Sequence, residues 1–389
     1  MDRPPPLFTA RFFVMCGFTF TVFLSAFMLF PTAPFRIVSL GGTKFAAGLF
    51  LGFLTYASAA SAPFTGALAD RLGKRRLLVI CGFALVAFSA AYALTRSYWV
   101  PLLLAIVHGC FWSGLLSASA AYLTDIIPES RRAEGIGYWG LSTNFALAVA
   151  PSMGLWLLRR DWLWVCAAAM VLNLVMTGIA WSLPEHEAPA AAREAPLFSR
   201  ELIEWRVLKI AGTLFLYSFG YGAIMSFSAL YADAMGVTPK AIYFTILAFG
   251  VILVRPFSGR LADRAGHRRV LMPSLLLIAA GIGLLAIATT RAGFVLSAAV
   301  FAGGFGTAYP AFVAHVMKHV DPRRRGAAFG SILAAFDTGI GTGSILTGFL
   351  TERFGFHVAF ALAAALAALS LPYFVLADKG LLATEPAQG

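Results

Sequence analysis

Residues 66–78 read GALADRLGKRRLL, and residues 259–271 read GRLADRAGHRRVL. A constant offset of 193 residues relates the two stretches, and the same offset aligns two further pairs, Arg132 with Arg325 and Gly137 with Gly330. A repeat of this length predicts that the two halves of the chain contain the same arrangement of elements. Each copy lies between two long apolar stretches, which indicates a loop between membrane-spanning segments.

The composition supports a membrane protein. The chain has 389 residues, of which 59% are hydrophobic and only 12% are charged. Soluble domains carry about a quarter charged residues, so this chain has too few charges to cover its surface in water. We therefore expect hydrocarbon around most of its length.

Apolar runs long enough to span a bilayer predict an all-α protein with twelve transmembrane helices in two parallel six-helix repeats. We expect the first six at 8–31, 43–68, 77–95, 98–126, 133–158 and 161–183, and the second six at 207–235, 239–260, 270–290, 292–319, 326–350 and 355–377. Residues 1–183 then form one bundle and residues 207–378 form the other. We interpret 184–206 as a cytoplasmic linker with room for a short amphipathic helix, and 379–389 as a cytoplasmic tail.

The basic residues predict the orientation. Short basic clusters at 71–76, 131–132, 260–269 and 323–325 fall on the side of both termini. The opposite side holds only eight basic residues, Arg36, Lys44, Arg96, Arg159, Arg160, Lys240, Arg291 and Arg353. The positive-inside rule therefore puts both termini in the cytoplasm. We expect the chain in a plasma membrane, the inner membrane of a bacterium. Nucleic acid is excluded as a partner, because the net charge of +12 is spread over these loops and forms no single basic face.

Motifs for catalysis are absent from the sequence. Its four cysteines lie inside apolar runs without metal-ligand spacing, and no P-loop or Ser/His/Asp set is present. The glycine clusters at 303–307 and 339–343 follow no strand, so we interpret them as helix-packing sites. We expect no enzyme activity, no cofactor and no metal, and a chain that functions as a monomer in the lipid bilayer.

The repeated loop resembles the signature of the Major Facilitator Superfamily, G-x-L-A-D-R-x-G-[RK]-R-R. The first copy is complete and contains Gly66, Asp70, Arg71, Gly73, Lys74 and Arg75. The second copy has His267 in place of the lysine and contains Gly259, Asp263, Arg264, Gly266 and Arg268. The resemblance covers nearly the whole chain and implies a transporter that works by alternating access.

The resemblance also implies that these residues act as a gate latch between the two halves. Asp70 would face the start of the helix at 326–350, where free N–H groups favour an anion. Asp125 matches the acidic residue that pairs with the cation of the motif, here Lys74. The alternative is that these residues only set topology and loop structure.

Residues 146–154, ALAVAPSMG, are similar to a motif of proton-driven antiporters in this superfamily. Ala150, Pro151 and Gly154 carry the similarity. A proline kink with close helix packing is the alternative. An arginine that drug antiporters often carry earlier in the chain is Ala105 here, so proton coupling through that arginine is excluded.

Three ionisable residues lie within apolar spans, where such groups are costly and often functional: Asp337, Arg255 and His108. Asp337 lies twelve residues after Arg325, about 18 Å along its helix, and we interpret it as the proton-coupling residue. Arg255 is expected about 7–8 Å from the cytoplasmic end of its span, where it either snorkels to the interface or pairs with Asp337. His108 is either a proton relay or substrate contact, or a satisfied hydrogen-bonding partner of another helix.

Hydroxyl and aromatic side chains follow the helices that border the central path in this superfamily. We expect the substrate near Thr21, Ser25, Trp112, Ser113, Tyr217, Tyr221 and Tyr309. Such side chains would hold an amphipathic or weakly polar molecule, although each of them also suits helix packing.

The sequence thus predicts a secondary active transporter of a small organic molecule, with proton-coupled efflux as the favoured activity. Uptake of a nutrient or metabolite by symport or uniport on the same fold is the alternative. Protons are the expected coupling ion.

Overall fold

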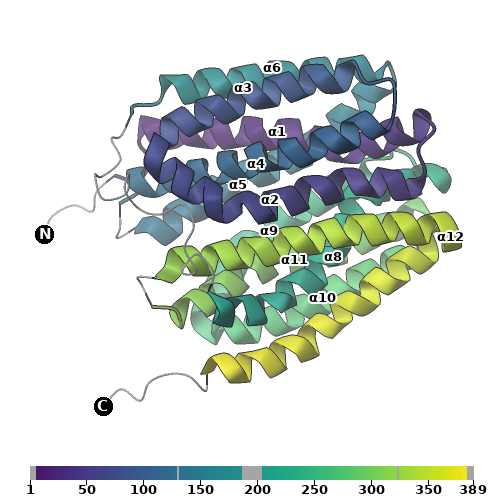
Figure 1. Ribbon diagram of the computed structural model, residues 1–389. Coiled ribbons are helices and arrows are strands. Elements are labelled where there is room, and N and C mark those ends of the chain that lie inside the picture. The colour runs from purple at the N-terminus through teal and green to yellow at the C-terminus, as the bar shows by residue number, and fades with distance from the viewer. Residues whose placement is uncertain (1–5, 129–130, 186–203, 322–323, 383–389) are drawn as a thin grey trace, which may run out of the picture.

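The computed structural model describes residues 6–128, 131–185, 204–321 and 324–382, and this part of the chain contains helices and no strand. Figure 1 shows the helices running side by side along the long axis of the bundle. The first six are α1 (Ala10–Ser39), α2 (Lys44–Leu72), α3 (Lys74–Ala93), α4 (Trp99–Ile126), α5 (Arg132–Leu158) and α6 (Trp162–Ser182). The others are α8 (Trp205–Ala234), α9 (Ile242–Ala265), α10 (His267–Ala286), α11 (Arg291–Lys318) and α12 (Arg325–Leu382).

Element α12 contains two helices. Its 58 residues include Gly355, whose φ of 83° is not helical. A straight helix of that length would be about 87 Å long, far more than the roughly 30 Å hydrocarbon core of a bilayer. With α12 divided at Gly355, each of the twelve predicted spans corresponds to a helix, and ten of the described elements are long and apolar enough to cross a membrane.

The all-helical membrane fold is confirmed, whereas several predicted boundaries are wrong. Helix α1 continues to Ser39 through Pro31 and Pro34, although the predicted span stops at 31. Prolines are tolerated in spanning helices because neighbouring groups satisfy the freed backbone. Helix α8 begins at Trp205, inside the predicted linker, and α12 reaches into the predicted tail. The amphipathic helix expected in the linker falls largely on 186–203, outside the described residues.

The offset of 193 extends over the helices of both halves. Helix α3 (Lys74–Ala93) and helix α10 (His267–Ala286) coincide when shifted by this offset. Each is preceded by a glycine with positive φ, 92° at Gly73 and 89° at Gly266. Only glycine adopts such a conformation without strain, which explains the glycine in both loops. Helices α1–α6 form the upper layer of Figure 1, and α8–α12 form the lower layer.

The two halves meet where α2 packs on α12 and α5 packs on α9. Contacts along α2 concentrate toward the end of the bundle that carries the turn at 40–43 and the kink at Gly355, which we call the closed end. There the Phe45 and Phe349 rings lie 6.1 Å apart. A Cβ atom added to Gly48 would lie 2.4 Å from the carbonyl oxygen of Ser344, so the two backbones nearly touch.

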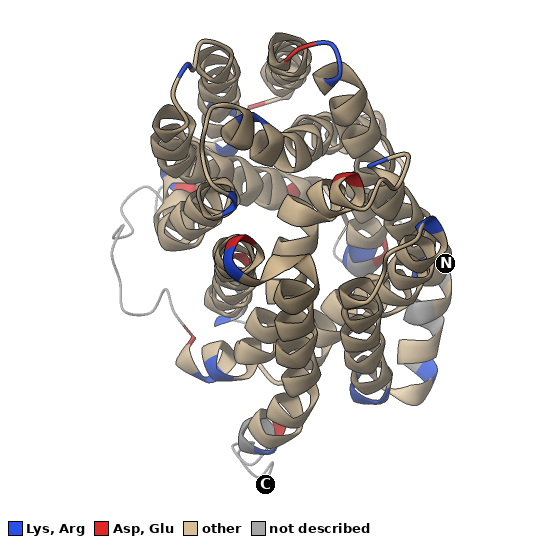
Figure 2. Cartoon of the chain, turned by 90° about the vertical axis from the view of Figure 1, so that its right-hand side faces the viewer, with Lys and Arg blue, Asp and Glu red and all other residues tan. Residues whose placement is uncertain are grey.

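At the opposite end, which carries the two repeated loops and which we call the motif end, the halves diverge. A Cβ atom added to Gly66 of α2 or to Gly330 of α12 would meet no atom of the described residues within 4 Å. Helix α1 begins and helix α12 ends at this same end of the bundle (Figure 1). Figure 2 looks onto the closed end, where the charged residues gather at turns and helix ends around largely uncharged ribbons.

Candidate functional site

Asp337 of α12 lies at the boundary between the two halves. The hydroxyl of Ser58 on α2 donates a hydrogen bond of 2.9 Å to Asp337 Oδ2. Toward the closed end, the contact continues with a 2.8 Å hydrogen bond between Tyr56 and Thr342. Toward the motif end, no described residue lies within 4 Å of a Cβ atom added to Gly66 of α2. The carboxylate therefore lies at the inner edge of the contact between α2 and α12.

An aromatic wall adjoins this carboxylate on the side of the second half. The ring of Phe336 lies 6.1 Å from Tyr217, 6.3 Å from Tyr221 and 5.3 Å from Tyr309. Tyr221 also stacks on Phe305 of α11 at 4.5 Å. Three predicted substrate residues thus come together beside Asp337, and we call the five rings the aromatic wall. The buried hydroxyl of Tyr217 has no hydrogen-bond partner within the described residues.

The predicted substrate residues of the first half form separate contacts. Trp112 packs edge-on against Phe23 at 5.5 Å, and Ser113 shares a 3.0 Å hydrogen bond with Thr65 of α2. Thr21 donates to the carbonyl of Gly17 one turn earlier, and Ser25 is buried. The hydroxyls of Thr21 and Ser113 thus have partners within their own half of the protein.

Arg255 lies deeper in the bundle than the sequence predicts. Helix α9 continues to Ala265, so Arg255 is ten residues, about 15 Å, from the end of the helix. The expected depth of 7–8 Å was too small because it placed the helix end at residue 260. A Cβ atom added to Gly140 of α5 would lie 2.8 Å from Arg255 Nη1, so the guanidinium lies against the other half. Its pairing with Asp337 stays a prediction.

His108 lies between α4 and α3. Its Nδ1 shares a 3.1 Å hydrogen bond with the Tyr92 hydroxyl, and its ring stacks on Phe88 at 5.2 Å. These contacts match the alternative in which His108 is a satisfied interhelical residue.

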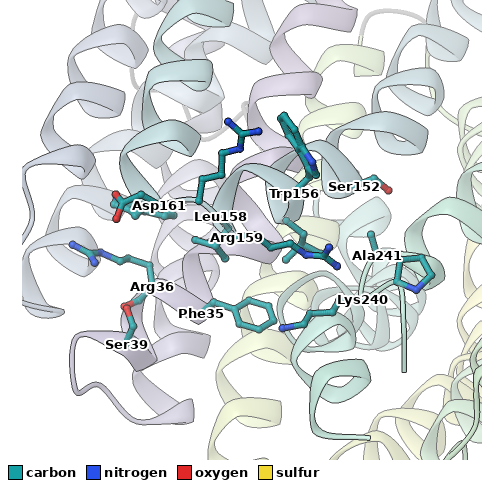
Figure 3. Close-up of a pocket in the computed structure, with 14 residues that line it drawn as sticks. Phe35, Arg36, Ser39, Ser152, Trp156, Leu158, Arg159, Asp161, Lys240 and Ala241 are labelled. Carbon is teal, nitrogen blue, oxygen red and sulfur yellow. The ribbon is translucent and has the colours of Figure 1, made fainter. Parts of the chain in front are cut away.

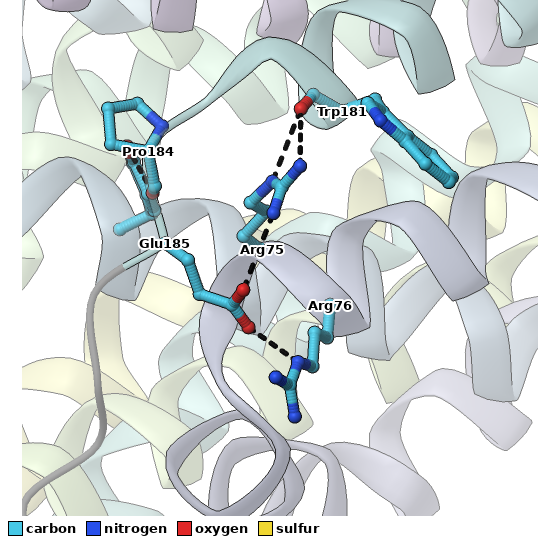
Figure 4. Close-up of polar contacts among 6 residues, drawn as sticks. Arg75, Arg76, Trp181, Pro184 and Glu185 are labelled. Carbon is cyan, nitrogen blue, oxygen red and sulfur yellow. Dashed lines mark hydrogen bonds and ion pairs between the residues drawn. The ribbon is translucent and has the colours of Figure 1, made fainter.

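The first repeated loop makes ion pairs inside the first half. Lys74 Nζ lies 2.5 Å from Asp125 Oδ2. Arg75 donates to the Trp181 carbonyl at 2.7 Å, and both Arg75 and Arg76 pair with Glu185 after α6 (Figure 4). Asp70 is exposed. Arg71 follows it in the last turn of α2.

The second repeated loop also has an arginine that pairs with an acid near the end of its half, and here a histidine shares that acid. Arg268 Nε lies 2.8 Å from Asp378 near the end of α12, and His315 Nε2 lies 2.7 Å from the other oxygen of the same carboxylate. Arg264 is exposed in the last turn of α9, and Gly266 precedes α10. The surroundings of Gly259 and the side chain of Asp263 lie outside the described part of the structure, so the predicted roles of both residues stay predictions.

Sequence reasoning missed Glu185 and Asp378, the partners of these arginines. The repeat offset relates them, as it relates Arg75 to Arg268, so the same comparison that found the loops would have found both acids. It also missed Ser58, because a serine in an apolar helix gives no signal of its own.

The motif at Ala150, Pro151 and Gly154 contributes to packing between α5 and α1. Ala150 is fully buried. Pro151 lies within α5. A Cβ atom at Gly154 would lie 2.6 Å from the carbonyl oxygen of Met28, so this glycine permits a close approach of two backbones.

Comparison with known proteins gives relatives along the whole chain. An uncharacterized MFS-type transporter of Salmonella typhimurium is 25% identical over 332 residues, which cover 83% of this chain and 84% of the relative. One of Burkholderia mallei is 26% identical over 371 residues, covering 92% of this chain and 90% of the relative.

Solved structures share the fold at low identity. A bacterial homologue of the human lysosomal transporter Spinster, in an inward-facing and occupied conformation, superposes with a TM-score of 0.78 at 14% identity, covering 97% of this chain and 98% of that one. The human organic anion transporter MFSD10 (TETRAN) gives 0.74 at 17% identity, with 96% and 100% coverage. The family model of the Major Facilitator Superfamily matches residues 15–250 and 210–388. From the repeated loops, the paired six-helix halves and this match, we conclude that the chain belongs to the Major Facilitator Superfamily of membrane transporters.

Proposed function

We propose that this transporter exports a small organic molecule by proton-coupled alternating access. The hydrogen bond between Ser58 and Asp337 is the observation that carries the proposal. It joins the two halves at the point where they diverge, so a change in the charge of the carboxylate acts on the contact between them. A carboxylate only accepts hydrogen bonds, whereas a protonated carboxyl group also donates.

This difference couples proton binding to the movement of the halves. When the halves separate at the closed end, Asp337 loses Ser58 and needs another partner or a proton, because an unpaired charge is costly at membrane depth. When they close again, the hydroxyl of Ser58 stabilises the ionised form. Proton uptake thus belongs to one conformation and proton release belongs to the other.

The aromatic wall supports an amphipathic substrate. Five rings from α8, α11 and α12 offer apolar area, and the hydroxyls of Tyr217, Tyr221 and Tyr309 offer polar contacts beside the carboxylate. A substrate between this wall and Trp112 of the first half would touch both halves, as alternating access requires.

We infer the orientation from the basic loops. The motif end carries most of the basic residues and belongs in the cytoplasm by the positive-inside rule, together with both termini. The closed end then faces outward, and the structure represents an inward-facing conformation. In the outward-facing conformation, the halves would meet at the motif end, where Asp70 would approach the start of α12 while Lys74 and Asp125 hold the loop in place.

The test is transport in a bacterial host stripped of its own efflux pumps. Wild type, Asp337→Asn and the matched control Glu352→Gln are expressed at equal membrane levels and compared for resistance to a broad compound panel. Glu352 lies on the same helix and accepts a 3.0 Å hydrogen bond from the Phe45 backbone at the closed end. We expect resistance with wild type and the control, and none with Asp337→Asn.

Transport assays in everted vesicles test proton coupling separately from export. Uptake of a compound identified in the panel should require an inward-acid proton gradient and should collapse when nigericin dissipates it. Equal activity of Asp337→Asn would refute the role of the carboxylate. Accumulation of compounds by intact cells, in place of resistance, would assign the uptake alternative.

A further inference from the structure

Half of the basic residues that the sequence places on the outer side gather in one cavity. The cavity has a volume of about 600 Å³, and Arg36, Arg159, Arg160 and Lys240 line it. We call it the basic cavity (Figure 3). Its residues come from the end of α1, from the end of α5 with the start of α6, and from the segment that joins α8 to α9. Both halves of the transporter therefore build it.

The acids near these cations compensate only part of their charge. Lys240 forms a 2.6 Å ion pair with Asp233. Asp161, the one acidic residue in the lining, accepts a hydrogen bond of 2.7 Å from the backbone N–H of Leu163 and thereby caps α6. Arg159 has no hydrogen bond or ion pair among the described residues.

Arg36 also has an unused donor. Its Nη2 donates to the carbonyl of Thr95 at 2.9 Å, but its buried Nε has no acceptor in the described part of the protein. A buried donor without a partner is costly, and such groups are rare in folded proteins.

Arg159 of the first half and Lys240 of the second half lie on either side of the boundary between the halves. In Figure 3 the side chain of Arg159 extends from α5 toward the segment at Lys240 and Ala241 of the second half. Like charges brought together on closure repel, and the repulsion is greatest where the site excludes water and salt. A bound anion between the cations would replace this repulsion with attraction.

The wall of the basic cavity is apolar and aromatic. Phe35, Leu155, Trp156 and Trp162 contribute to the lining. Arg160 lies 5.1 Å from the ring of Trp156, and Lys240 lies 5.3 Å from the ring of Phe35. A small inorganic ion would leave this apolar surface unused, whereas an anionic group attached to an aromatic or aliphatic body would cover it.

We propose that the basic cavity binds an amphipathic organic anion at the outer mouth and that this binding stabilises the closed arrangement of the outer ends. The guanidinium groups bind the carboxylate, sulfonate or phosphate group, and the rings pack on the apolar body. The anion is either a solute of the outer medium or an anionic lipid of the outer leaflet, since both carry this chemistry. The site is distinct from the transport path at Asp337.

The experiment uses full-length protein in nanodiscs of neutral phosphatidylcholine, with naphthalene-2-sulfonate as the probe. Closure is measured as disulfide cross-linking between Phe45→Cys and Phe349→Cys, with the four native cysteines replaced, and binding is measured as thermal stabilisation. We expect the probe to increase both. Arg159→Gln and Lys240→Gln should each raise the half-saturating probe concentration at least about tenfold, the loss of one strong contact to an anion. The control Arg96→Gln, an exposed outer cation that does not line the cavity, should change it less than about twofold.

Two comparisons make the proposal falsifiable. Equal stabilisation by neutral 2-naphthalenemethanol, or equal half-saturation in all variants, would overturn it. Because the two substitutions lie on opposite halves, misfolding of one variant would leave the other variant to test the proposal. Added phosphatidylglycerol that promotes cross-linking in wild type, but not in Arg159→Gln, would identify the lipid as the source, whereas no effect of the lipid would identify a solute. Asp337→Asn should retain probe binding, because Asp337 does not line the basic cavity. Probe binding therefore tests this proposal separately from the transport proposal.

Discussion

The two halves of this transporter have the same framework and different charges at matching positions. The repeat offset places Asn144 opposite Asp337 and Ala62 opposite Arg255, so both of these membrane-embedded charges belong to the second half. Asn144 donates within its own helix to the carbonyl of Gly140, whereas Asp337 reaches Ser58 of the other half. The two halves therefore share a scaffold, while the second half carries both charged side chains at these matching positions.

In the repeated loops, the ion pair that the two halves do not share belongs to the first half. In the first half, Lys74 pairs with Asp125, while the matching residues of the second half are His267 and Lys318, which cannot form such a pair. An arginine paired with an acid after the sixth helix is present in both halves, as Arg75 with Glu185 and Arg268 with Asp378. We interpret the shared pair as a structural requirement, and a specialised role for the unshared pair stays a prediction.

The largest effect is expected from moving the carboxylate between the halves. The double variant Asp337→Asn with Asn144→Asp restores the number of acids but places the charge on α5 of the first half. We expect proton-driven transport to fall to the level of empty vesicles, because an amide at position 337 can still accept the hydrogen bond from Ser58 but cannot bind or release a proton. Transport that survives in this variant would show that the halves are interchangeable, and Asn144→Asp alone serves as the control.

Removing the acid from each shared ion pair should cost more stability where the acid is buried than where it is exposed. Asp378 is 1% exposed and contacts both Arg268 and His315, whereas the Glu185 side chain is 34% exposed. Asp378→Asn should lower the free energy of unfolding by about 2–3 kcal/mol, because the amide removes the charge and one of the two acceptor oxygens that Arg268 and His315 share. Glu185→Gln should cost about 1 kcal/mol or less. Unfolding in detergent measures both, and equal losses would contradict the distinction.

Substitutions at matching helix-packing sites should change the free energy of unfolding by a smaller amount, which differs between the halves. Gly343 of α12 corresponds to Ala150 of α5, and a Cβ atom at Gly343 would lie 1.9 Å from the carbonyl oxygen of Phe219 on α8. Gly343→Ala should therefore destabilise the protein by about 1–3 kcal/mol, the usual cost of overpacking. The reverse change, Ala150→Gly, should cost only about 0.5–1 kcal/mol. A tolerated methyl group at Gly343 would mean that the two packing sites are equivalent.

The smallest effect is expected at the unshared ion pair. Asp125→Asn removes the partner of Lys74, and both side chains are partly exposed, so the free energy of unfolding should change by about 1 kcal/mol or less. A latch role would appear instead as slower transport with unchanged stability. Lys318→Gln at the matching position is the control, and equal effects on transport would argue against a specialised loop in the first half.

Predictions from the sequence were most accurate where the signal is periodic or repeated. Apolar runs revealed the spans, and the loops at Gly73 and Gly266 revealed the repeat, because a bilayer imposes a minimum helix length and a tight turn requires glycine. Boundaries were less accurate, as at Pro31 and Pro34 in α1, because hydropathy does not show which prolines a helix accommodates. The depth of Arg255 was wrong because the predicted span ends at residue 260, whereas α9 continues to Ala265.

The sequence by itself determined that this chain is a helical membrane protein built from two repeats, because composition and periodicity are properties of the chain alone. Only the tertiary structure decided the partners: Ser58 for Asp337, the aromatic wall from three helices, and the cations of the basic cavity from both halves. These residues are separated by tens to hundreds of positions in the sequence. Their proximity depends on which faces of the helices meet, and helix packing sets that choice through small residues whose effect no single segment reveals.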